Sequence, residues 1–206
     1  MVAIQNNSDN TEVKLSNMEI VLVRHGKPEK SQNTRLGSAG FANWVRNYNH
    51  SMVANTSRPN IVFTDSFDDY YVVSSDLPRA VHSCEIALNK PPNLKSALYR
   101  EMDIPRFKLP FTLNAWTWVY VNRALWTVGK TGPFESYRQA KKRAKIAAQE
   151  LITIAQKEGK VIVFAHGYLN LHMRKHFRNY GFKQTCKSSQ YWGVTAFESG
   201  SQETSC

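Results

Sequence analysis

The sequence predicts an α/β fold, a three-layer α/β/α sandwich around a mostly parallel sheet. Two observations lead to this class. Short apolar runs rich in β-branched residues occur at 18–23, 71–74 and 160–165, and such runs are typical of strands covered on both faces. Segments of helical character stand between them, and this alternation is typical of a parallel sheet with helices on its faces.

The composition is that of an ordinary globular protein. The chain has 206 residues, of which 42% are hydrophobic and 21% are charged, and this length suits one domain with a sizeable core. We expect a flexible leader over 1–16, an α/β domain over 17–198 and a flexible tail over 199–206. The leader lacks the apolar stretch of a secretion signal, and the three cysteines form no CxxC pair. These features predict a cytoplasmic protein.

Several element boundaries carry recognisable signals. Ser38 is a candidate N-cap, Pro78 suits the first turn of a helix, and Gly159 suits the position just after one. From these signals and from apolar periodicity we expect helices at about 38–53, 78–88, 135–157 and 169–178. We expect strands at 18–23, 71–74, 96–100, 160–165 and 192–197.

Residues 111–128 are aromatic-rich and continuous enough to raise the question of a membrane helix. Asn114, Asn122 and Arg123 interrupt the stretch, which is shorter than the about 20 residues that a bilayer span requires. We predict a helix that lies in the core or covers the site as a lid. A helix bound to a membrane surface is the alternative, and the role of the segment stays open.

The chain is strongly basic, with a formal net charge of +11 and a pI of about 9.7. Such a balance favours anionic partners but does not choose among them. No RNA-binding aromatic signature or paired-cysteine finger is present, so we expect no nucleic acid partner and no stable membrane association. Two clusters on predicted helices, interpreted as solvated helix faces, hold much of the excess: Lys141-Lys142-Arg143 with Lys145, and Arg174-Lys175-His176 with Arg178.

Three predicted strands end in residues that suit an anion. EIVLVRHG at 19–26 and KVIVFAHG at 160–167 each finish in a His-Gly pair, and Gly26 and Gly167 let a ligand or another backbone approach closely. VVSSDLPRA at 72–80 runs into a helix start that carries Arg79. Ligands of parallel sheets bind beyond the carboxyl ends of the strands. We therefore expect a cationic set suited to a tetrahedral phosphoryl group, made of Arg24, His25, Arg79 and His166.

These motifs resemble the histidine phosphatase superfamily, which includes the cofactor-dependent phosphoglycerate mutases. The resemblance lies in Arg24-His25-Gly26, in the segment Ser75-Asp76-Leu77-Pro78-Arg79-Ala80 and in Ala165-His166-Gly167, whose order and spacing match over about residues 18–198. It implies a metal-independent phosphoric monoester hydrolase with no cofactor and a phosphohistidine intermediate. The substrate would be a phosphorylated small molecule or protein.

The resemblance also implies a role for each of these residues. His25 is the nucleophile, while Arg24, Arg79 and His166 hold the phosphoryl oxygens. Activation of His25 needs an acceptor on its other ring nitrogen, which we expect to be a backbone carbonyl near the strand end. The family's acidic residue falls at Glu101, our first choice as general acid.

Alternatives remain open for the proton donor and for the residues around it. Asp103 is the substitute for Glu101 as proton donor. The non-catalytic alternative is that Glu101 is a surface carboxylate paired with Arg100 or Arg106. Further candidate contacts to the substrate are Gly26, Arg35, Ser75, Gly167 and Tyr168. Tyr168 stands where a small residue is common, so it would narrow the pocket or stack on a substrate.

The sequence also departs from the mutases. After Gly26 it continues Lys27-Pro28-Glu29-Lys30-Ser31-Gln32-Asn33, which places Asn33 out of register for the phosphate contact that mutases make. Arg35 is a candidate to reach the anion instead, although an exposed loop arginine is equally consistent. The segment 105–134 does not resemble the mutases' substrate loops. These differences favour a phosphatase over a mutase.

Three further hypotheses are weighed against the phosphatase. A phosphoglycerate mutase is one, and a non-catalytic module that binds phosphorylated partners is another. His172 and His176 have a spacing that binds zinc, but with no third ligand nearby beyond His166 we interpret them as exposed helix histidines and expect no metal. The oligomeric state stays open.

Overall fold

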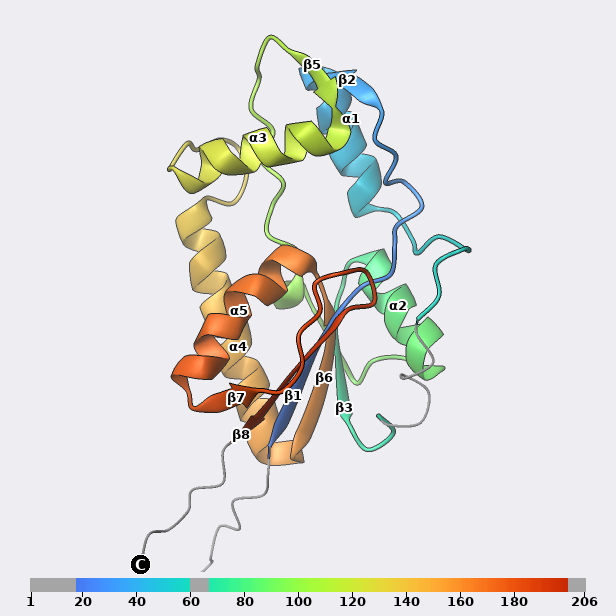
Figure 1. Cartoon of the computed structure of the whole chain (residues 1–206), viewed down its shortest axis with the longest axis vertical. Coiled ribbons are helices and arrows are strands. Elements are labelled where there is room, and N and C mark those ends of the chain that lie inside the picture. Colours follow the sequence, from blue (N-terminus) through green and yellow to red (C-terminus); the bar gives the residue numbers. More distant parts are fainter. Residues whose placement is uncertain (1–17, 60–66, 200–206) are drawn as a thin grey trace, which may run out of the picture.

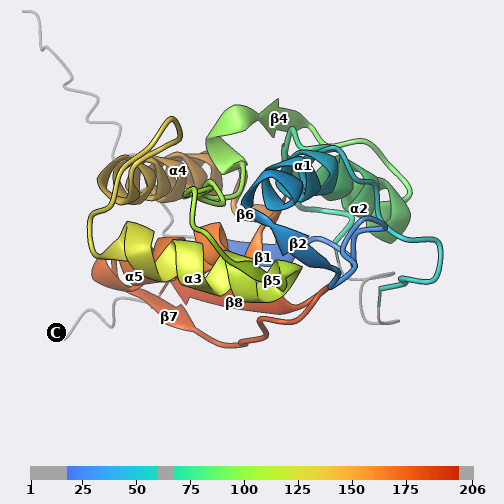
Figure 2. The ribbon, with the colours of Figure 1, turned by 90° about the horizontal axis from the view of Figure 1, so that it is seen from above.

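The computed structural model describes residues 18–59 and 67–199, and it shows a six-stranded sheet between layers of helices (Figures 1 and 2). The sheet has the order β4-β3-β6-β1-β8-β7. Its four strands from β4 to β1 are mutually parallel, and β8 and β7 add an antiparallel edge. The strands are β1 (Glu19–Arg24), β3 (Tyr71–Ser75), β4 (Leu94–Ser96), β6 (Lys160–Ala165), β7 (Phe182–Gln184) and β8 (Val194–Ser199). The predicted α/β class with a mostly parallel sheet is confirmed.

The expected flexible ends fall mostly outside this structure. The leader at 1–16 lies outside the described residues, and so do residues 200–206 of the expected tail. Ser199, the first residue assigned to that tail, instead ends β8.

Helices cover both faces of the sheet because each central strand is apolar on both. Helix α2 (Pro78–Leu88) lies on one face, and α4 (Tyr137–Glu158) and α5 (Gly167–Asn179) lie on the other. In β1, Ile20 and Leu22 belong to the core cluster under α4 and α5, whereas Val21 and Val23 belong to the cluster on the α2 side. This alternation is what a strand buried on both faces requires.

Helix α4 approaches the sheet closely because its inner face consists largely of alanines. Its start is fixed by a capping box, in which Ser136 Oγ accepts from Gln139 N and the Gln139 side chain returns to the Ser136 backbone. Its end is fixed by Gly159, whose φ of 80° is unfavourable for a residue with a Cβ. Buried on the inner face are Ala140, Ala144, Ala147, Ala148 and Ala155.

A separate layer, here called the cap, stands above the carboxyl ends of the parallel strands (Figure 1). It consists of α1 (Ser38–Asn49), α3 (Ala115–Thr127) and the two-stranded pair of β2 (Arg35–Gly37) and β5 (Thr112–Asn114). Aromatic rings hold it together, since Phe41 stacks on Trp118 with 5.5 Å between ring centroids.

The aromatic segment 111–128 is thus part of the cap. It forms β5 and α3, whose inner side chains pack on α1 in a core cluster of their own. None of the helices in the described part of the chain is both long and apolar enough to cross a bilayer.

Several predicted boundaries were wrong, and local backbone geometry explains the differences. The strand expected at 96–100 ends at Ser96, whose hydroxyl accepts from Leu98 N and starts a short 3-10 helix, η2 (Ala97–Tyr99). The last strand begins at Val194 because Trp192 has a φ of 61° and leaves the extended region. Helix α1 is capped by Gly37, not Ser38, and ends at Asn49.

We expect Ser136→Ala to lower the free energy of unfolding by about 1 kcal/mol, because α4 loses an N-cap side chain. Thr153→Ala is the matched control: Thr153 lies exposed in the same helix and bonds back to the Gln149 carbonyl, so its loss should cost less than about 0.5 kcal/mol. Urea denaturation of both variants measures the difference. Equal losses would show that the capping box does not stabilise α4.

Candidate active site

The structure brings the predicted cationic residues together at the carboxyl ends of β1, β3 and β6. His25 follows β1, Arg79 lies in the first turn of α2, and His166 follows β6. Arg79 Nε lies 3.2 Å from His25 Nε2, and the His25 and His166 rings are 5.0 Å apart between centroids. All three side chains are buried. Parallel strand polarity therefore places them as the sequence suggested.

His25 is held as a neutral imidazole whose unprotonated nitrogen accepts a hydrogen bond from Arg79. Its Nδ1 lies 2.7 Å from the Gly26 carbonyl oxygen, and because a carbonyl only accepts, Nδ1 carries the proton. Nε2 then keeps its lone pair and accepts from Arg79. Burial, followed by the positive charge of Arg79, holds the pKa of His25 well below its ordinary value of 6.5.

Arg79 is a fully buried guanidinium that lacks a carboxylate within ion-pair distance among the described residues. It donates to the carbonyls of Tyr48 and Asn49 at 3.2 and 3.3 Å, which lie at the C-terminal end of α1. The negative end of the helix dipole and the Tyr48 ring, 4.7 Å from the guanidinium carbon, face its charge. Its Nη2 has no hydrogen-bond partner among the described residues.

His166 presents a second unpartnered donor beside His25. Its Nε2 lies 2.9 Å from Ser75 Oγ, which also accepts from Leu77 N. In the tautomer in which Nε2 accepts the Ser75 proton, Nδ1 carries a proton, and this nitrogen has no partner within the described structure. Burial, then the charge of Arg79, lowers the pKa of His166 well below 6.5.

Arg24 supplies a third donor. Its Nη1 donates to the Ser189 carbonyl at 2.8 Å, and its guanidinium carbon lies 4.2 Å from the centroid of the Tyr191 ring. Its Nε is buried and has no partner among the described residues. An unsatisfied buried donor costs about 1–3 kcal/mol, so three such donors around one histidine mark a place that suits an oxyanion.

Side chains of the site approach both glycines of the His-Gly pairs closely, and the expected approach of a ligand to them stays a prediction. A Cβ on Gly26 would lie 2.5 Å from the Trp192 ring. A Cβ on Gly167 would lie 3.2 Å from Arg24 Nε. These glycines therefore allow Trp192 and Arg24 to close around the site.

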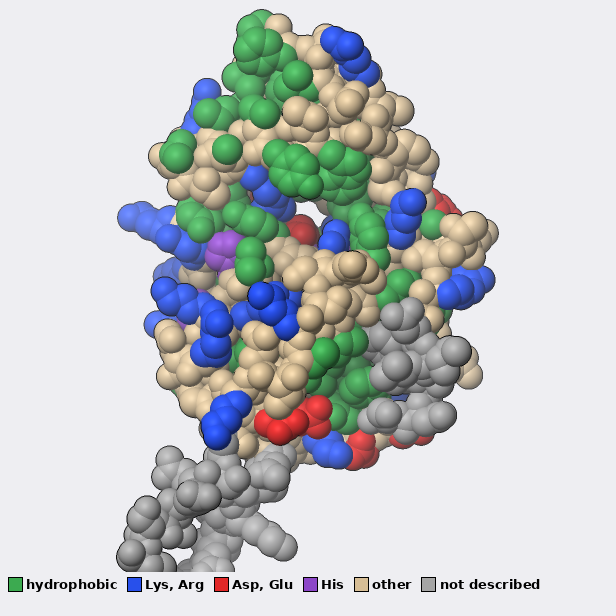
Figure 3. All heavy atoms as spheres, in the orientation of Figure 1, with side chains coloured by type: hydrophobic (Ala, Val, Ile, Leu, Met, Phe, Trp, Pro, Cys, Tyr) green, Lys and Arg blue, Asp and Glu red, His purple; other side chains and the backbone are tan. Residues whose placement is uncertain are grey.

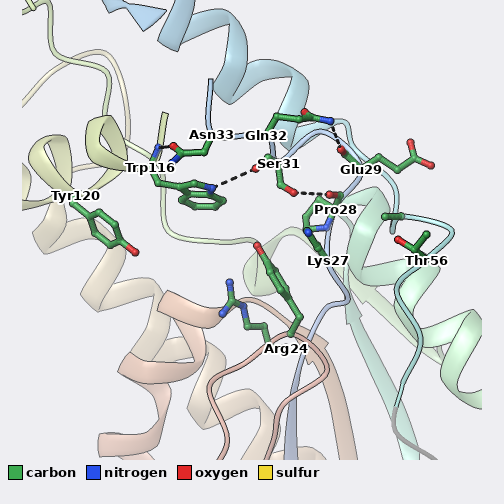
Figure 4. Close-up of a pocket in the computed structure, with 12 residues that line it drawn as sticks. Arg24, Lys27, Pro28, Glu29, Ser31, Gln32, Asn33, Thr56, Trp116 and Tyr120 are labelled. Atoms are coloured by element: carbon green, nitrogen blue, oxygen red, sulfur yellow. Dashed lines mark hydrogen bonds between the residues drawn. The ribbon is translucent and has the colours of Figure 1, made fainter. Parts of the chain in front are cut away.

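A cavity of about 700 Å³ lies below α3 of the cap, and of the four predicted cationic residues Arg24 alone belongs to its described lining. Figure 4 shows Arg24 at its base, Trp116 and Tyr120 of α3 on one side, and the loop from Lys27 to Asn33 around the other. Its volume lies within the range of small-molecule sites. Asn33, out of register for a phosphate contact, accepts from Trp116 N and so binds the first turn of α3.

The two candidate proton donors line a smaller cavity of about 100 Å³ together with Asn49, whose carbonyl accepts from Arg79. Glu101 Oε1 accepts from Met102 N and Leu169 N, and its Oε2 accepts from Tyr168 N at 3.2 Å. Asp103 Oδ2 accepts from Glu135 N at 2.9 Å. Neither carboxylate forms an ion pair with Arg100, which binds Asp76 instead.

Two further candidates lie elsewhere. Arg35 is exposed in β2 of the cap and does not line the large cavity. Tyr168 packs against the Arg123 guanidinium at 4.0 Å and lines a different hollow, between α4 and α5. A direct role of either residue toward the substrate stays a prediction.

The histidine pair on α5 is half-buried rather than exposed. His172 Nδ1 donates to the Tyr168 carbonyl at 2.9 Å, and its Nε2 lies 3.3 Å from the Tyr137 hydroxyl. In the described part of the chain, no group of three His, Cys, Asp or Glu side chains lies close enough to hold a metal ion.

Residues 185–193 form a loop over His25, here called the covering loop, which no sequence pattern predicted. Its Tyr191 ring lies 5.8 Å from the His25 ring, between centroids. Trp192 N donates to the Arg24 carbonyl, and Arg24 N donates to the Gly193 carbonyl. The left-handed backbone of Trp192 makes this sharp turn, and such conformations persist where the surroundings over-determine them.

Two arginines expected on solvated helix faces are tied inward, which corrects that interpretation. Arg174 is buried and donates to Thr195 Oγ1, to the Ser188 carbonyl and to Ser189 Oγ, so it anchors the covering loop. Arg143 forms a bidentate pair with Glu135 and donates to the carbonyls of the segment 98–101 that ends at Glu101. Helical spacing cannot reveal such contacts, because the partners lie outside the helix that carries each arginine.

We expect Arg174→Met to loosen the covering loop. Hydrogen bonds to charged groups contribute about 1.5–3 kcal/mol, so the amides of Ser188 and Trp192 should exchange at least about tenfold faster. Hydrogen exchange followed by mass spectrometry measures this. Arg178→Met, which removes an exposed arginine of the same helix, is the matched control; equal exchange in both variants would show that Arg174 does not anchor the loop.

Comparisons with known proteins agree with this geometry. The sequence model of the histidine phosphatase superfamily (branch 1) matches residues 63–201, a range that includes Arg79 and His166 but begins after His25. No curated protein matches the chain.

Solved structures of similar fold include the product of an open reading frame of Mycobacterium tuberculosis. It is 18% identical, with a TM-score of 0.53 over 76% of this chain and 77% of that one. A mycobacterial glucosyl-3-phosphoglycerate phosphatase in complex with VO3 is 14% identical, with a TM-score of 0.51 over 87% and 92% of the two chains. At these identities the likeness supports the fold alone.

Proposed function

Since the chain belongs to the histidine phosphatase superfamily, we propose that it is a metal-independent phosphatase that hydrolyses a phosphomonoester or a phosphohistidine through a phosphohistidine intermediate on His25. One observation carries the proposal. A neutral His25 presents Nε2 beside the buried Arg79, whose charge has no carboxylate partner among the described residues. A phosphoryl dianion would compensate the positive charge of Arg79 and would lie next to His25 Nε2, the proposed nucleophile.

In the first step, His25 Nε2 gives up the hydrogen bond from Arg79 Nε and attacks phosphorus with its lone pair, so that a P–N bond forms and the P–O bond to the leaving group breaks. The unpartnered donors of Arg24, Arg79 and His166 would bind the phosphoryl oxygens and stabilise their charge in the transition state. The Gly26 carbonyl, which accepts from Nδ1, stabilises the positive charge that develops on the ring.

The leaving alkoxide takes a proton from a carboxyl group. We propose Glu101, because its Oε2 accepts a single hydrogen bond from the described residues and so has room for a proton. Glu101 also lines the small cavity beside Asn49, whose carbonyl accepts from Arg79, and this neighbourhood supports the choice. In the second step the same carboxylate accepts a proton from water, the water oxygen attacks phosphorus, and the P–N bond breaks. Asp103 remains the substitute.

The large cavity favours a phosphorylated small molecule as substrate. It holds about 700 Å³ and offers the aromatic side chains of Trp116, Tyr120 and Tyr191 to the part of the substrate beyond the phosphate. Aromatic walls bind apolar, aromatic or sugar groups through their faces.

We expect His25→Ala to lower the hydrolysis of an aryl phosphate at least about 10³-fold, because the nucleophile is removed. The assay contains EDTA, so that contaminating metal-dependent phosphatases contribute nothing. Brief exposure of the wild-type protein to a radiolabelled substrate should also leave an acid-labile phosphohistidine that the variant lacks.

His50→Ala is the matched control, since His50 is exposed at the end of α1. Full activity in His25→Ala would falsify the mechanism. Transfer of phosphate between positions of a phosphorylated three-carbon acid, with little free phosphate, would identify a mutase instead. Failure of the wild-type protein across phosphomonoesters, phosphopeptides and sugar phosphates would point to a binding module.

We expect the titration of His25 in the free protein to lie below pH 6.5, and Arg79→Met to raise its pKa. Protonation of His25 places two positive charges side by side, so removal of the Arg79 charge makes protonation easier. NMR of the imidazole C–H signals over the acidic range measures both values. Arg178→Met should leave the His25 titration unchanged, and the same result for Arg79→Met would contradict the proposed coupling.

A further inference from the structure

A second basic site lies on the α4–α5 face, away from the large cavity. The two helices enclose a groove of about 600 Å³, here called the basic groove. Figure 3 shows Lys and Arg side chains gathered on this side around a histidine and apolar groups. Its cations come from α4 at spacings of three and four residues and from one turn of α5: Arg138, Lys141, Lys142, Lys145 and Lys175. No Asp or Glu belongs to its described lining.

The floor of the basic groove is aromatic and apolar. The Tyr168 and His172 rings are 4.7 Å apart between centroids, and the Tyr137 and His172 rings are 5.8 Å apart. Leu171 lies beside them with 52% of its surface exposed. One face of the Tyr137 ring already holds Lys141 Nζ at 4.6 Å, and one face of the Tyr168 ring holds the Arg123 guanidinium at 4.0 Å. A rim of full charges beside these rings fits an anion that also carries a flat ring.

The charges on the rim are not compensated within the described structure. The ion pairs of the described residues include none of the five groove cations. The excess of positive charge also affects His176. Burial, and then the charges of Lys145 and Lys175, lower the pKa of this histidine. Burial, together with Arg123 and Lys141, also lowers the pKa of His172, against the opposing effects of Glu101 and the Tyr168 carbonyl.

We propose that the basic groove binds a nucleoside polyphosphate, with the phosphates on the rim and the base on the aromatic floor. The shape favours this ligand over two others. A groove is concave, so a flat membrane surface would not reach its floor. The cations on α4 span residues 138–145, about 10 Å of helix, which suits a small molecule better than a long nucleic acid. This inference is independent of the proposed phosphatase activity.

Binding of ATP to the His25→Ala variant tests the proposal, because that variant leaves the nucleotide intact if the phosphatase mechanism holds. The double substitution Lys142→Gln with Lys175→Gln should weaken ATP binding about tenfold, as two charge contacts are lost. Lys95→Gln with Lys108→Gln, which removes the same charge from exposed positions outside the groove, should leave binding within about twofold. NMR signals of His172 and His176 should shift on binding.

Further measurements give the outcomes that decide. Inorganic tripolyphosphate should bind about tenfold or more weakly than ATP, since it has no ring to stack on the floor; equal affinity would overturn the nucleotide assignment. Binding of RNA or of phosphatidylserine vesicles without binding of ATP would overturn it too.

ATP binding that orthovanadate blocks and the groove variant retains would locate the nucleotide at the His25 site instead of the basic groove. Unchanged aryl phosphate hydrolysis by the groove double variant with His25 intact, or its wild-type circular dichroism if the protein is inactive, shows that the variant is folded.

Discussion

The hydrogen bonds of the buried Arg79 guanidinium connect α2, His25 and the cap, and the rest of the site is built around this connection. Arg79 lies in the first turn of α2, and its Nε donates to His25, which follows β1. Its Nη1 donates to the carbonyls of Tyr48 and Asn49 at the end of α1. One side chain thus joins the sheet to the cap. A guanidinium buried without these contacts would be strongly destabilising, so the position of α1 and the position of His25 are determined together.

The C-terminal part of the chain completes the enclosure through a second arginine. Arg174 binds Ser188, Ser189 and Thr195, and the Ser189 carbonyl accepts from Arg24. The covering loop is therefore bonded on one side to α5 and on the other to the residue that precedes His25. Tyr191 of the loop lies beside the imidazole, and burial is the largest cause of the lowered pKa of His25.

The sequence predicted the parts that depend on local pattern. Strands β1, β3 and β6 are continuous apolar runs, and the position of Arg24, His25, Arg79 and His166 follows from where such runs end. The pairing of β2 with β5 could not be predicted, because each has three residues and its partner lies more than 70 residues away. The inward contacts of Arg143 and Arg174 were missed because their partners lie outside the helix that carries each arginine. From its spacing in a helix alone, such an arginine is predicted to be solvent-exposed, because its hydrogen-bond acceptors come from other parts of the tertiary fold.

The absence of a carboxylate partner for Arg79 among the described residues is itself an argument about chemistry. A carboxylate in contact with Arg79 would compensate its charge, and it would also repel a phosphoryl dianion and raise the pKa of His25. The carbonyls at the end of α1 orient the guanidinium without adding a full negative charge. They hold Arg79 in place and leave its charge available to the ligand. Helix α1 therefore contacts the site through its backbone carbonyls. For this reason no side-chain motif in α1 predicted that the cap takes part in the site.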